Sequence, residues 1–273
     1  MKKHSVLKAA ALTAAAYTVS LRGRTKHPDL EILRRYRFAH RGYHDKPVVP
    51  ENSLPAFRRA IEHGWGADLD VHLMKDGTLA VIHDSSLLRT AGADVQIEDL
   101  TREELENYRL EGTDERIPLF DEVLALFENT TPLIIELKAA NGNHFALSKA
   151  VCERLDSYKG VFCIESFDPM VVADVRELRP GICRGQLAEN FLKDKGALDP
   201  VRSVLATGLI GNALAKPDFI AFKFEDRSCV SNALCLKLWG IQGVAWTIRS
   251  KHDLLTAEAE GLIPIFEKFD PEA

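Results

Sequence analysis

The chain has 273 residues, of which 46% are hydrophobic, 27% charged and 8% aromatic, and its formal net charge at pH 7 is −5. This composition excludes a collagen, a largely disordered chain and a polytopic membrane protein. The acidic balance, with no basic stripe interrupted by aromatic residues, argues against a nucleic-acid partner. The length suits either two small domains or one (β/α)8 barrel of about 250 residues.

Residues 1–35 differ from the rest and form a basic, Ala-rich leading segment. Lys2, Lys3 and Lys8 precede an uncharged run from Ala9 to Leu21, and further basic residues follow. This run is shorter than the roughly 20 residues that span a bilayer. Three interpretations stay open: a membrane anchor within residues 1–25, a signal peptide, or a surface helix. An anchor would make the protein membrane-associated; without one we expect it in the cytoplasm.

From residue 36 to residue 273, short apolar runs alternate with segments of helical periodicity, which predicts an α/β domain. Most runs are almost continuously apolar, as in parallel strands buried on both faces. We expect nine strands, at Arg37–Gly42, Ala67–Leu73, Leu79–Asp84, Leu133–Lys138, Val161–Phe167, Ile182–Leu187, Phe219–Phe224, Val244–Ile248 and Leu262–Glu267. Helices are expected at Leu54–Ile61, Leu119–Phe127, Ala146–Leu155, Pro169–Leu178 and Asp253–Ala259.

Nine strands are one too many for an eightfold barrel, and the turn Lys75-Asp76-Gly77 resolves the difference. Asp-Gly between two apolar runs is a strong hairpin signal. So short a loop joins antiparallel strands, because a parallel crossover needs a dozen or more residues. The run Leu79–Asp84 is therefore the returning arm of a hairpin. The chain is predicted to be a single (β/α)8 TIM barrel with a β-hairpin after its second strand.

Polar residues stand at or near the carboxyl ends of the first three predicted barrel strands. They are His40 and Arg41, then Asp68 and Asp70, then Glu136 and Lys138. In a TIM barrel these ends share one face, where active sites lie. The hairpin leaves that face and returns, so it brings His83 to the same mouth. Because Asp68 and Asp70 are two residues apart on a strand, both point to one side.

This set of side chains suits metal-assisted chemistry on a phosphate. Carboxylates without cysteine fit Mg2+ or Ca2+ rather than zinc, so Asp68, Asp70 and Glu136 are candidate ligands. Arg41 and Lys138 would place fixed positive charge beside the metal, as a phosphate group requires. Two histidines at converging strand ends suit proton transfer. Each pattern alone has a simpler explanation, such as a solvated strand end or an ion pair.

Several motifs follow one another in a specific order. They are Phe38-Ala39-His40-Arg41-Gly42, Pro50-Glu51-Asn52-Ser53-Leu54, Asp70-Val71, Lys75-Asp76-Gly77, His83-Asp84, Glu136-Leu137-Lys138, Ser166-Phe167, Gly185-Gln186-Leu187 and Trp246-Thr247. With them the chain resembles the glycerophosphodiester phosphodiesterases over residues 37–269. The resemblance implies a TIM barrel that uses a divalent metal, Mg2+ or Ca2+, to hydrolyse a small-molecule glycerophosphodiester to sn-glycerol 3-phosphate and an alcohol.

The resemblance also implies a role for individual residues. It makes His40 and His83 the general acid and base, Arg41 and Lys138 the phosphate ligands, and Asp68, Asp70 and Glu136 the metal ligands. In such enzymes a glycerol hydroxyl of the substrate can act as the internal nucleophile. Trp246 and Phe167 would wall the glycerol side, although barrel-interior packing is an equal alternative for them. Asn52 either caps the following helix or orients active-site groups.

The chain departs from the family pattern at several positions. Asp68 replaces a glutamate, and its side chain falls about 1.5 Å short unless the strand shifts. Met74 replaces a commonly polar residue, and the last strand ends in Glu267 rather than in a threonine–aspartate pair. Residues 85–117 are expected to form a small insertion over the barrel mouth. Two alternatives stay open: a lysophospholipid-active, phospholipase D-like barrel, and a weakly active barrel that binds phosphorylated ligands.

Overall fold

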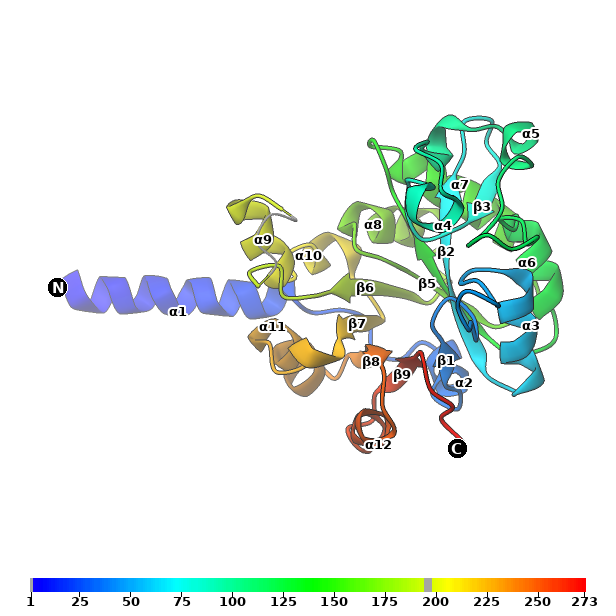
Figure 1. Cartoon of the computed structure of the whole chain (residues 1–273). Coiled ribbons are helices and arrows are strands. Elements are labelled where there is room, and N and C mark those ends of the chain that lie inside the picture. The colour runs from blue at the N-terminus through cyan, green and yellow to red at the C-terminus, as the bar shows by residue number, and fades with distance from the viewer. Residues whose placement is uncertain (1, 194–197) are drawn as a thin grey trace.

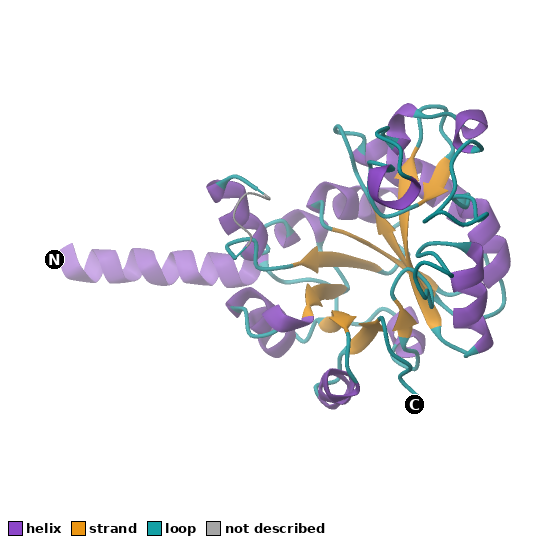
Figure 2. Ribbon diagram, viewed as in Figure 1, coloured by secondary structure: helices purple, strands orange, loops and turns teal. Residues whose placement is uncertain are grey.

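Parallel pairing of apolar strands closes a barrel in the computed structural model, which describes residues 2–193 and 198–273. The eight parallel strands are β1 (Phe38–Ala39), β2 (Gly66–Leu73), β4 (Leu133–Leu137), β5 (Phe162–Ser166), β6 (Arg184–Ala188), β7 (Phe219–Lys223), β8 (Gln242–Ile248) and β9 (Ile263–Phe266). Strand β1 pairs with both β2 and β9, which closes the ring. Figures 1 and 2 show the helices around this sheet. The predicted TIM barrel is confirmed.

The extra strand, predicted at Leu79–Asp84, is the returning arm of the hairpin. Strand β3 (Leu79–Val81) pairs antiparallel with the end of β2, with Val81 opposite Val71. Gly77 has a φ of +88°, and the carboxylate of Asp76 accepts a hydrogen bond from the Thr78 amide at 3.0 Å. The turn residues therefore stabilise the reversal, as the Asp-Gly pair predicts.

The five predicted helices are all present. They are α3 (Leu54–Glu62), α6 (Phe120–Phe127), α7 (His144–Leu155), α8 (Pro169–Leu178) and α12 (Lys251–Ala259). The other α-helices are α1 (Lys2–Ser20), α2 (Asp29–Leu33), α4 (Leu88–Ala91), α5 (Arg102–Leu105), α9 (Pro200–Thr207), α10 (Asn212–Ala215) and α11 (Val230–Ala233), and Leu234–Leu238 forms a π-helical turn. Most of these are too short to show a clear apolar period.

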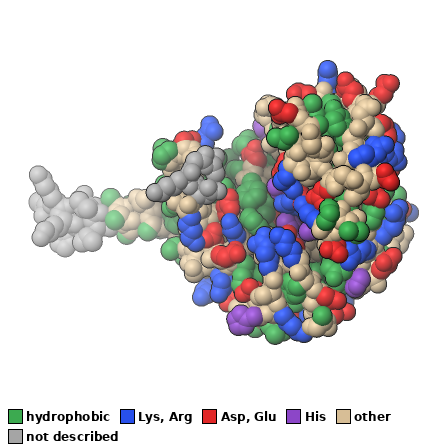
Figure 3. Space-filling model, in the orientation of Figure 1, with side chains coloured by type: hydrophobic (Ala, Val, Ile, Leu, Met, Phe, Trp, Pro, Cys, Tyr) green, Lys and Arg blue, Asp and Glu red, His purple; other side chains and the backbone are tan. Residues whose placement is uncertain are grey.

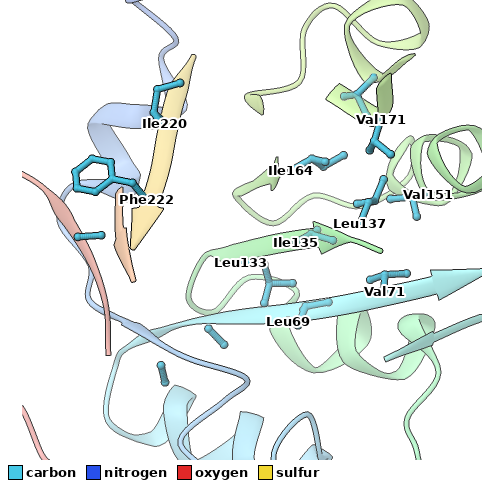
Figure 4. Close-up of a cluster of buried hydrophobic side chains, with 14 of the residues drawn as sticks. Leu69, Val71, Leu133, Ile135, Leu137, Val151, Ile164, Val171, Ile220 and Phe222 are labelled. Atoms are coloured by element: carbon cyan, nitrogen blue, oxygen red, sulfur yellow. The ribbon is translucent and has the colours of Figure 1, made fainter. Parts of the chain in front are cut away.

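Alternate strand residues build two separate hydrophobic layers. Ile135 and Leu137 face the helices, in the layer that Figure 4 shows with Val151 of α7 and Val171 of α8. Ile134 belongs to the other cluster, which takes residues from most of the parallel strands and so fills the barrel interior. Because side chains alternate, Glu136 continues the interior face of β4 toward its carboxyl end. The interior layer thus forms the floor of the barrel mouth.

The predicted insertion has a small core of its own. Met74, Ile82, Leu87, Ile97 and Leu100 are among the buried residues that pack there. Met74 is 3% exposed, so the apolar side chain at this unusual position is explained by the insertion that it supports. A capping box starts α5, with the Thr101 amide donating to Glu104 at 2.8 Å.

Helix α1 projects from the barrel (Figure 1). The Tyr17 hydroxyl donates to the Gly208 carbonyl at 3.1 Å, and the Trp239 indole donates to the Thr18 carbonyl at 2.7 Å. Among residues 2–193 and 198–273, no helix is long and apolar enough to cross a membrane. Residue 1 of the possible anchor lies outside the described residues.

The packed core starts earlier than the predicted boundary at residue 36. Leu21 is fully buried, and Leu30 and Leu33 of α2 are 1% exposed within the interior cluster. Arg24 donates to the buried carboxylate of Asp218 at 2.7 Å. Residues 21–35 are therefore part of the barrel's packing, and the separate leading segment is limited to α1.

We predict that Leu30→Ala lowers the free energy of unfolding by about 2–5 kcal/mol, because it removes a buried side chain and leaves a cavity. Leu12→Ala is the matched control, since Leu12 is 72% exposed on α1, and its effect should stay within about 0.5 kcal/mol. Urea denaturation measures both. Equal, small effects would show that α2 does not contribute to the barrel's stability.

Candidate active site

A pocket of about 380 Å³ opens at the carboxyl ends of the barrel strands. His40, Arg41, Asp68, His83, Glu136 and Lys138 all line it. The aromatic rings of Phe167 and Trp246 also line it. Asp70 is buried and contacts the lining residue Lys138, and Asn52 is buried and contacts Asp70. The structure thus brings together every residue that the sequence analysis selects for the site, at the face where TIM barrels place their active sites.

His40 is held by a carboxylate that belongs to the last strand. Its Nδ1 lies 2.8 Å from Glu267 Oε2, and its Nε2 lies 3.8 Å from Asp68 Oδ2. Burial lowers the pKa of His40 to about 4, although the hydrogen bond to Glu267 opposes this shift. His40 is therefore neutral near pH 7, with its Nδ1 proton donated to Glu267 and its Nε2 lone pair available.

His83 is oriented in the same way from the hairpin. Its Nδ1 lies 2.5 Å from Asp84 Oδ1, and Asp84 in turn accepts from Arg89. Burial and the nearby cations Lys138 and Arg41 outweigh Asp70 and lower the pKa of His83. Each histidine therefore has one ring nitrogen bonded to a carboxylate and the other left for the pocket.

Arg41 is fixed by a buried carboxylate. Its Nη1 donates to Glu51 Oε1 at 2.9 Å, and the same oxygen accepts from Arg89 Nη2 at 2.6 Å. Lys46 also pairs with Glu51. Burial alone would raise the pKa of Glu51, but these cations hold it well below its usual range. A carboxylate with three cationic partners holds the Arg41 guanidinium in place beside the pocket.

Lys138 neutralises two of the predicted metal ligands. Its Nζ lies 3.0 Å from Asp70 Oδ1 and 2.7 Å from Glu136 Oε1. Asn52 donates to Asp70 Oδ2 at 2.8 Å, and Ser53 caps α3 by accepting from the Ala56 amide. Of the two roles open for Asn52, orientation of an active-site carboxylate is therefore the one that its contacts match.

Two further carboxylates, Asp68 and Glu165, each have a buried oxygen without a hydrogen-bond partner among the described residues. Asp68 is 4% exposed and Glu165, on β5, is 2% exposed. The oxygens are Asp68 Oδ1 and Glu165 Oε2. Burial and the neighbouring carboxylates raise the pKa of both groups. A buried carboxylate oxygen without a partner is stabilised only by a bound cation or by protonation of the carboxyl group.

Four carboxylates at the mouth supply the kind of oxygen ligand that a hard divalent cation prefers. Asp70, Glu136 and Glu165 occupy one register row across β2, β4 and β5, and Asp68 precedes Asp70 on the same face. As the side chains stand, no three His, Cys, Asp or Glu residues within 2–193 and 198–273 are arranged to hold an ion, and Lys138 already pairs with two of the four. The unpaired oxygens of Asp68 and Glu165 are the observation that favours a cation.

One wall of the pocket is aromatic. Trp246 and Phe167 meet edge to face with ring centroids 5.8 Å apart, and the Trp246 indole donates to the Ala221 carbonyl at 3.1 Å. Both rings border the pocket, yet both also pack against the barrel-interior cluster. The two roles considered for these residues are thus compatible.

Four further charged residues at the mouth were not expected as site residues from the sequence. Glu165 lies next to the last residue of β5, Lys223 ends β7 and Arg249 follows β8, and all three line the pocket; Glu267 follows β9 and contacts His40. All four satisfy the strand-end rule that identified His40, so applying it to every strand would have found them. Arg249 Nε donates to Glu267 Oε1 at 2.6 Å, which makes Glu267 the link between two sides of the mouth.

The fold and this site define a TIM barrel with two histidines, cations and buried carboxylates at its mouth. Residues 40–266 match the model of the glycerophosphoryl diester phosphodiesterase family. The chain therefore belongs to this family, as its motifs indicate.

Individual relatives are similar over part of the chain. A glycerophosphodiester phosphodiesterase of Caldanaerobacter subterraneus is 36% identical over 55% of this chain and 65% of its own length. A human lysophospholipase D is 37% identical over 40% of this chain and 37% of its own. The chain thus spans less than two thirds of the lengths of the curated relatives that it matches first.

Solved structures share the fold. The glycerophosphodiester phosphodiesterase of Thermotoga maritima superposes with a TM-score of 0.63 at 25% identity, over 85% of this chain and 94% of that one. An Oleispira antarctica phosphodiesterase, solved with the product sn-glycerol-3-phosphate, superposes with a TM-score of 0.67 at 23% identity, over 85% and 92%.

We predict that Glu51→Gln lowers the free energy of unfolding at pH 7 by about 1–3 kcal/mol, because Arg41, Lys46 and Arg89 lose the buried carboxylate that they share. Glu51 has a depressed pKa in the folded state, so its stabilisation is present above its unfolded pKa of about 4.3 and is lost as the pH falls. The difference between wild type and variant should therefore shrink from pH 6 to pH 3. Urea titrations at several pH values measure it; a constant difference would contradict the prediction.

Proposed function

We propose that this protein is a metal-dependent phosphodiesterase that hydrolyses glycerophosphodiesters to sn-glycerol 3-phosphate and an alcohol. One observation carries the proposal: two histidines, each bonded through Nδ1 to a carboxylate, face a pocket that holds buried cations. Family membership and the names of its relatives support the same activity. Membrane association through residues 1–25 stays a prediction, supported by the exposed Leu12 and Val19 on α1.

The two histidines would share the proton transfers. One takes the proton from a glycerol hydroxyl as its oxygen bonds to phosphorus, and the other protonates the alcohol oxygen as its bond to phosphorus breaks. The product of this first step is a cyclic glycerol phosphate. Water then opens the ring, and the two histidines exchange their proton-transfer roles. Glu267 and Asp84 keep the two rings in the required tautomer and favour the imidazolium when it forms.

The cations would hold the phosphate and the charge that develops on it. Arg41 is aligned by Glu51, and Lys138 by Asp70 and Glu136, so neither has to be ordered when substrate arrives. Prepositioned donors of this kind stabilise a phosphoryl transition state more than a flexible surface lysine would.

Asp68, Asp70 and Glu136 are the proposed metal ligands, and Glu165 is added to them because its Oε2 is buried in the described structure without a partner. A bound Mg2+ or Ca2+ would supply Lewis-acid stabilisation of negative oxygen. Glu165 lies near enough to Asp68 for the two carboxylates to repel each other, so it would add an oxygen ligand beside the short side chain of Asp68.

We predict that His40→Ala and His83→Ala each lower the release of sn-glycerol 3-phosphate from glycerophosphocholine by at least about 100-fold, since each removes a proton-transfer group. His252→Ala, on the outer helix α12, is the control and should keep full activity. A coupled assay for sn-glycerol 3-phosphate measures the rates. Retained activity in either site variant would remove that histidine from the mechanism.

We predict that EDTA abolishes activity and that Mg2+ or Ca2+ restores it.

By calorimetry, Glu165→Gln should weaken metal binding by about tenfold, in the range found when metal sites lose supporting groups, whereas Asp68→Glu should strengthen it. Without metal, Glu165→Gln should be at least as stable as wild type, because it removes a repelling carboxylate. Glu177→Gln, on the outer helix α8, is the control. Full activity in EDTA would contradict the metal requirement. Unchanged metal affinity in Glu165→Gln would exclude Glu165 as a metal ligand.

A further inference from the structure

His72 is a buried polar side chain that the proposed mechanism does not use. It is 2% exposed and follows Asp68 and Asp70 on the same face of β2. Its Nδ1 lies 2.6 Å from Glu98 Oε1, and its Nε2 lies 3.2 Å from the backbone carbonyl oxygen of His83. The His72 ring therefore connects the insertion to the loop that carries His83.

Both oxygens that face the His72 ring are acceptors. A backbone carbonyl has no hydrogen to give, so the Nε2–H group donates to it. Burial alone would raise the pKa of Glu98, but the hydrogen bond with His72 holds this pKa below its ordinary value. Glu98 is therefore ionised near pH 7 and accepts from Nδ1. Turning the ring over would put carbon atoms where the two nitrogens lie, so these contacts fix its orientation.

The insertion in turn holds Glu98 in place. Glu98 lies in the short 3-10 turn η1 (Ile97–Asp99), and its Oε1 also accepts from the Ser85 hydroxyl at 2.9 Å. The backbone supports the same arrangement, because the Ile97 amide donates to the Ser85 carbonyl at 2.8 Å. One carboxylate oxygen thus joins His72 of β2 to the segment that follows β3.

The insertion is packed firmly enough to serve as this support. Ile97, next to Glu98, is fully buried, and Leu87 and Leu100 belong to the same small core. The outer surface of the lobe around α4 and α5 shows charged side chains of both signs (Figure 3). Its apolar side chains are therefore used in its own packing, which fixes the turn that carries Glu98.

His83 lies beyond the support of the sheet. Strand β3 ends at Val81, whereas the His83 ring lines the pocket with its Nδ1 bonded to Asp84. Asp84 sets the direction of the ring. The carbonyl contact with His72 ties the backbone of the loop to β2, the strand that also supplies two of the proposed metal ligands.

We propose that His72 is a positioning residue for proton transfer by His83, and that Glu98 makes the insertion part of this arrangement. The inference rests on the proposed function and adds to it a residue that touches neither the substrate nor the reacting atoms. Its effect is on distance, because a displacement of about 1 Å at a reacting group can cost about 100-fold in rate.

The first test removes both hydrogen bonds with His72→Leu, which keeps an apolar side chain at this buried position. With glycerophosphocholine and saturating metal, kcat should fall by about ten- to a hundredfold, because His83 is displaced. KM should stay within about twofold, since Arg41 and Lys138 keep their carboxylate partners. His72→Gln should restore most of the lost kcat, because its Nε2 can donate to the same carbonyl.

Two glutamates of the insertion form a matched pair. Glu98→Ala removes the partner of His72 and should lower kcat in the same way. Glu104→Ala removes the capping box of α5, so it should lower the free energy of unfolding by about 1 kcal/mol and leave kcat unchanged. In proteins that urea denaturation shows to be folded, an unchanged kcat in His72→Leu, or an equal loss in the two glutamate variants, would overturn the inference and leave the proposed function standing.

A spectroscopic test does not depend on activity. Proton–nitrogen NMR of protein with isotope-labelled histidine shows which ring nitrogen of His83 carries hydrogen, and His83→Ala identifies the signals. The Nδ1–H form should predominate in wild type and in His72→Gln, whereas His72→Leu should show a mixture of the two tautomers. An identical His83 spectrum in wild type and His72→Leu would overturn the inference. A folded wild type that does not hydrolyse glycerophosphocholine with either metal would instead overturn the proposed function.

Discussion

The site depends on holding several carboxylates together inside the mouth of a barrel. Asp68, Asp70, Glu136 and Glu165 are all at least nine-tenths buried, on three neighbouring strands. Burial, with a smaller contribution from the neighbouring carboxylate of Asp70, raises the pKa of Glu136 to about 7 although Lys138 opposes the shift. Lys138 offsets part of this charge, and its own pKa rises in return, even though burial acts in the opposite direction. Buried charges persist only when they are paired in this way or bind a metal.

The barrel makes this crowding possible because its strands are short and rigid. The interior cluster below the site packs Ile134 and Cys163 two positions before Glu136 and Glu165. These apolar residues set the height at which the carboxylates stand, and α2 adds Leu30 and Leu33 to the same cluster. The packing of the interior cluster therefore also determines where the carboxylates lie. Residues 21–35 contribute to the site in this way, because α2 is part of that cluster.

The mouth combines charged side chains with an aromatic wall. Strands β1, β2 and β4 and the hairpin contribute both histidines, Arg41 and Lys138, and Lys223 and Arg249 add positive charge from β7 and β8. The aromatic wall is formed by Phe167, after β5, and Trp246 of β8. Phe167 also lines a second, more apolar cavity that α9 borders.

Local sequence pattern determined most of the barrel and the central residues of the site. Apolar runs predicted the strands, and the Asp76-Gly77 turn distinguished the hairpin arm from the barrel strands. Polar residues at strand ends predicted His40, Asp70, Glu136 and Lys138 as site residues. These features could be predicted because strand burial and turn chemistry are local properties. The tertiary structure decided the partners: Glu267 for His40, Glu51 for Arg41, and Glu165 beside Asp68. It also placed α9 over the cavity and residues 21–35 in the core. These contacts join residues far apart in the chain, and they follow from register and packing, which no local pattern records.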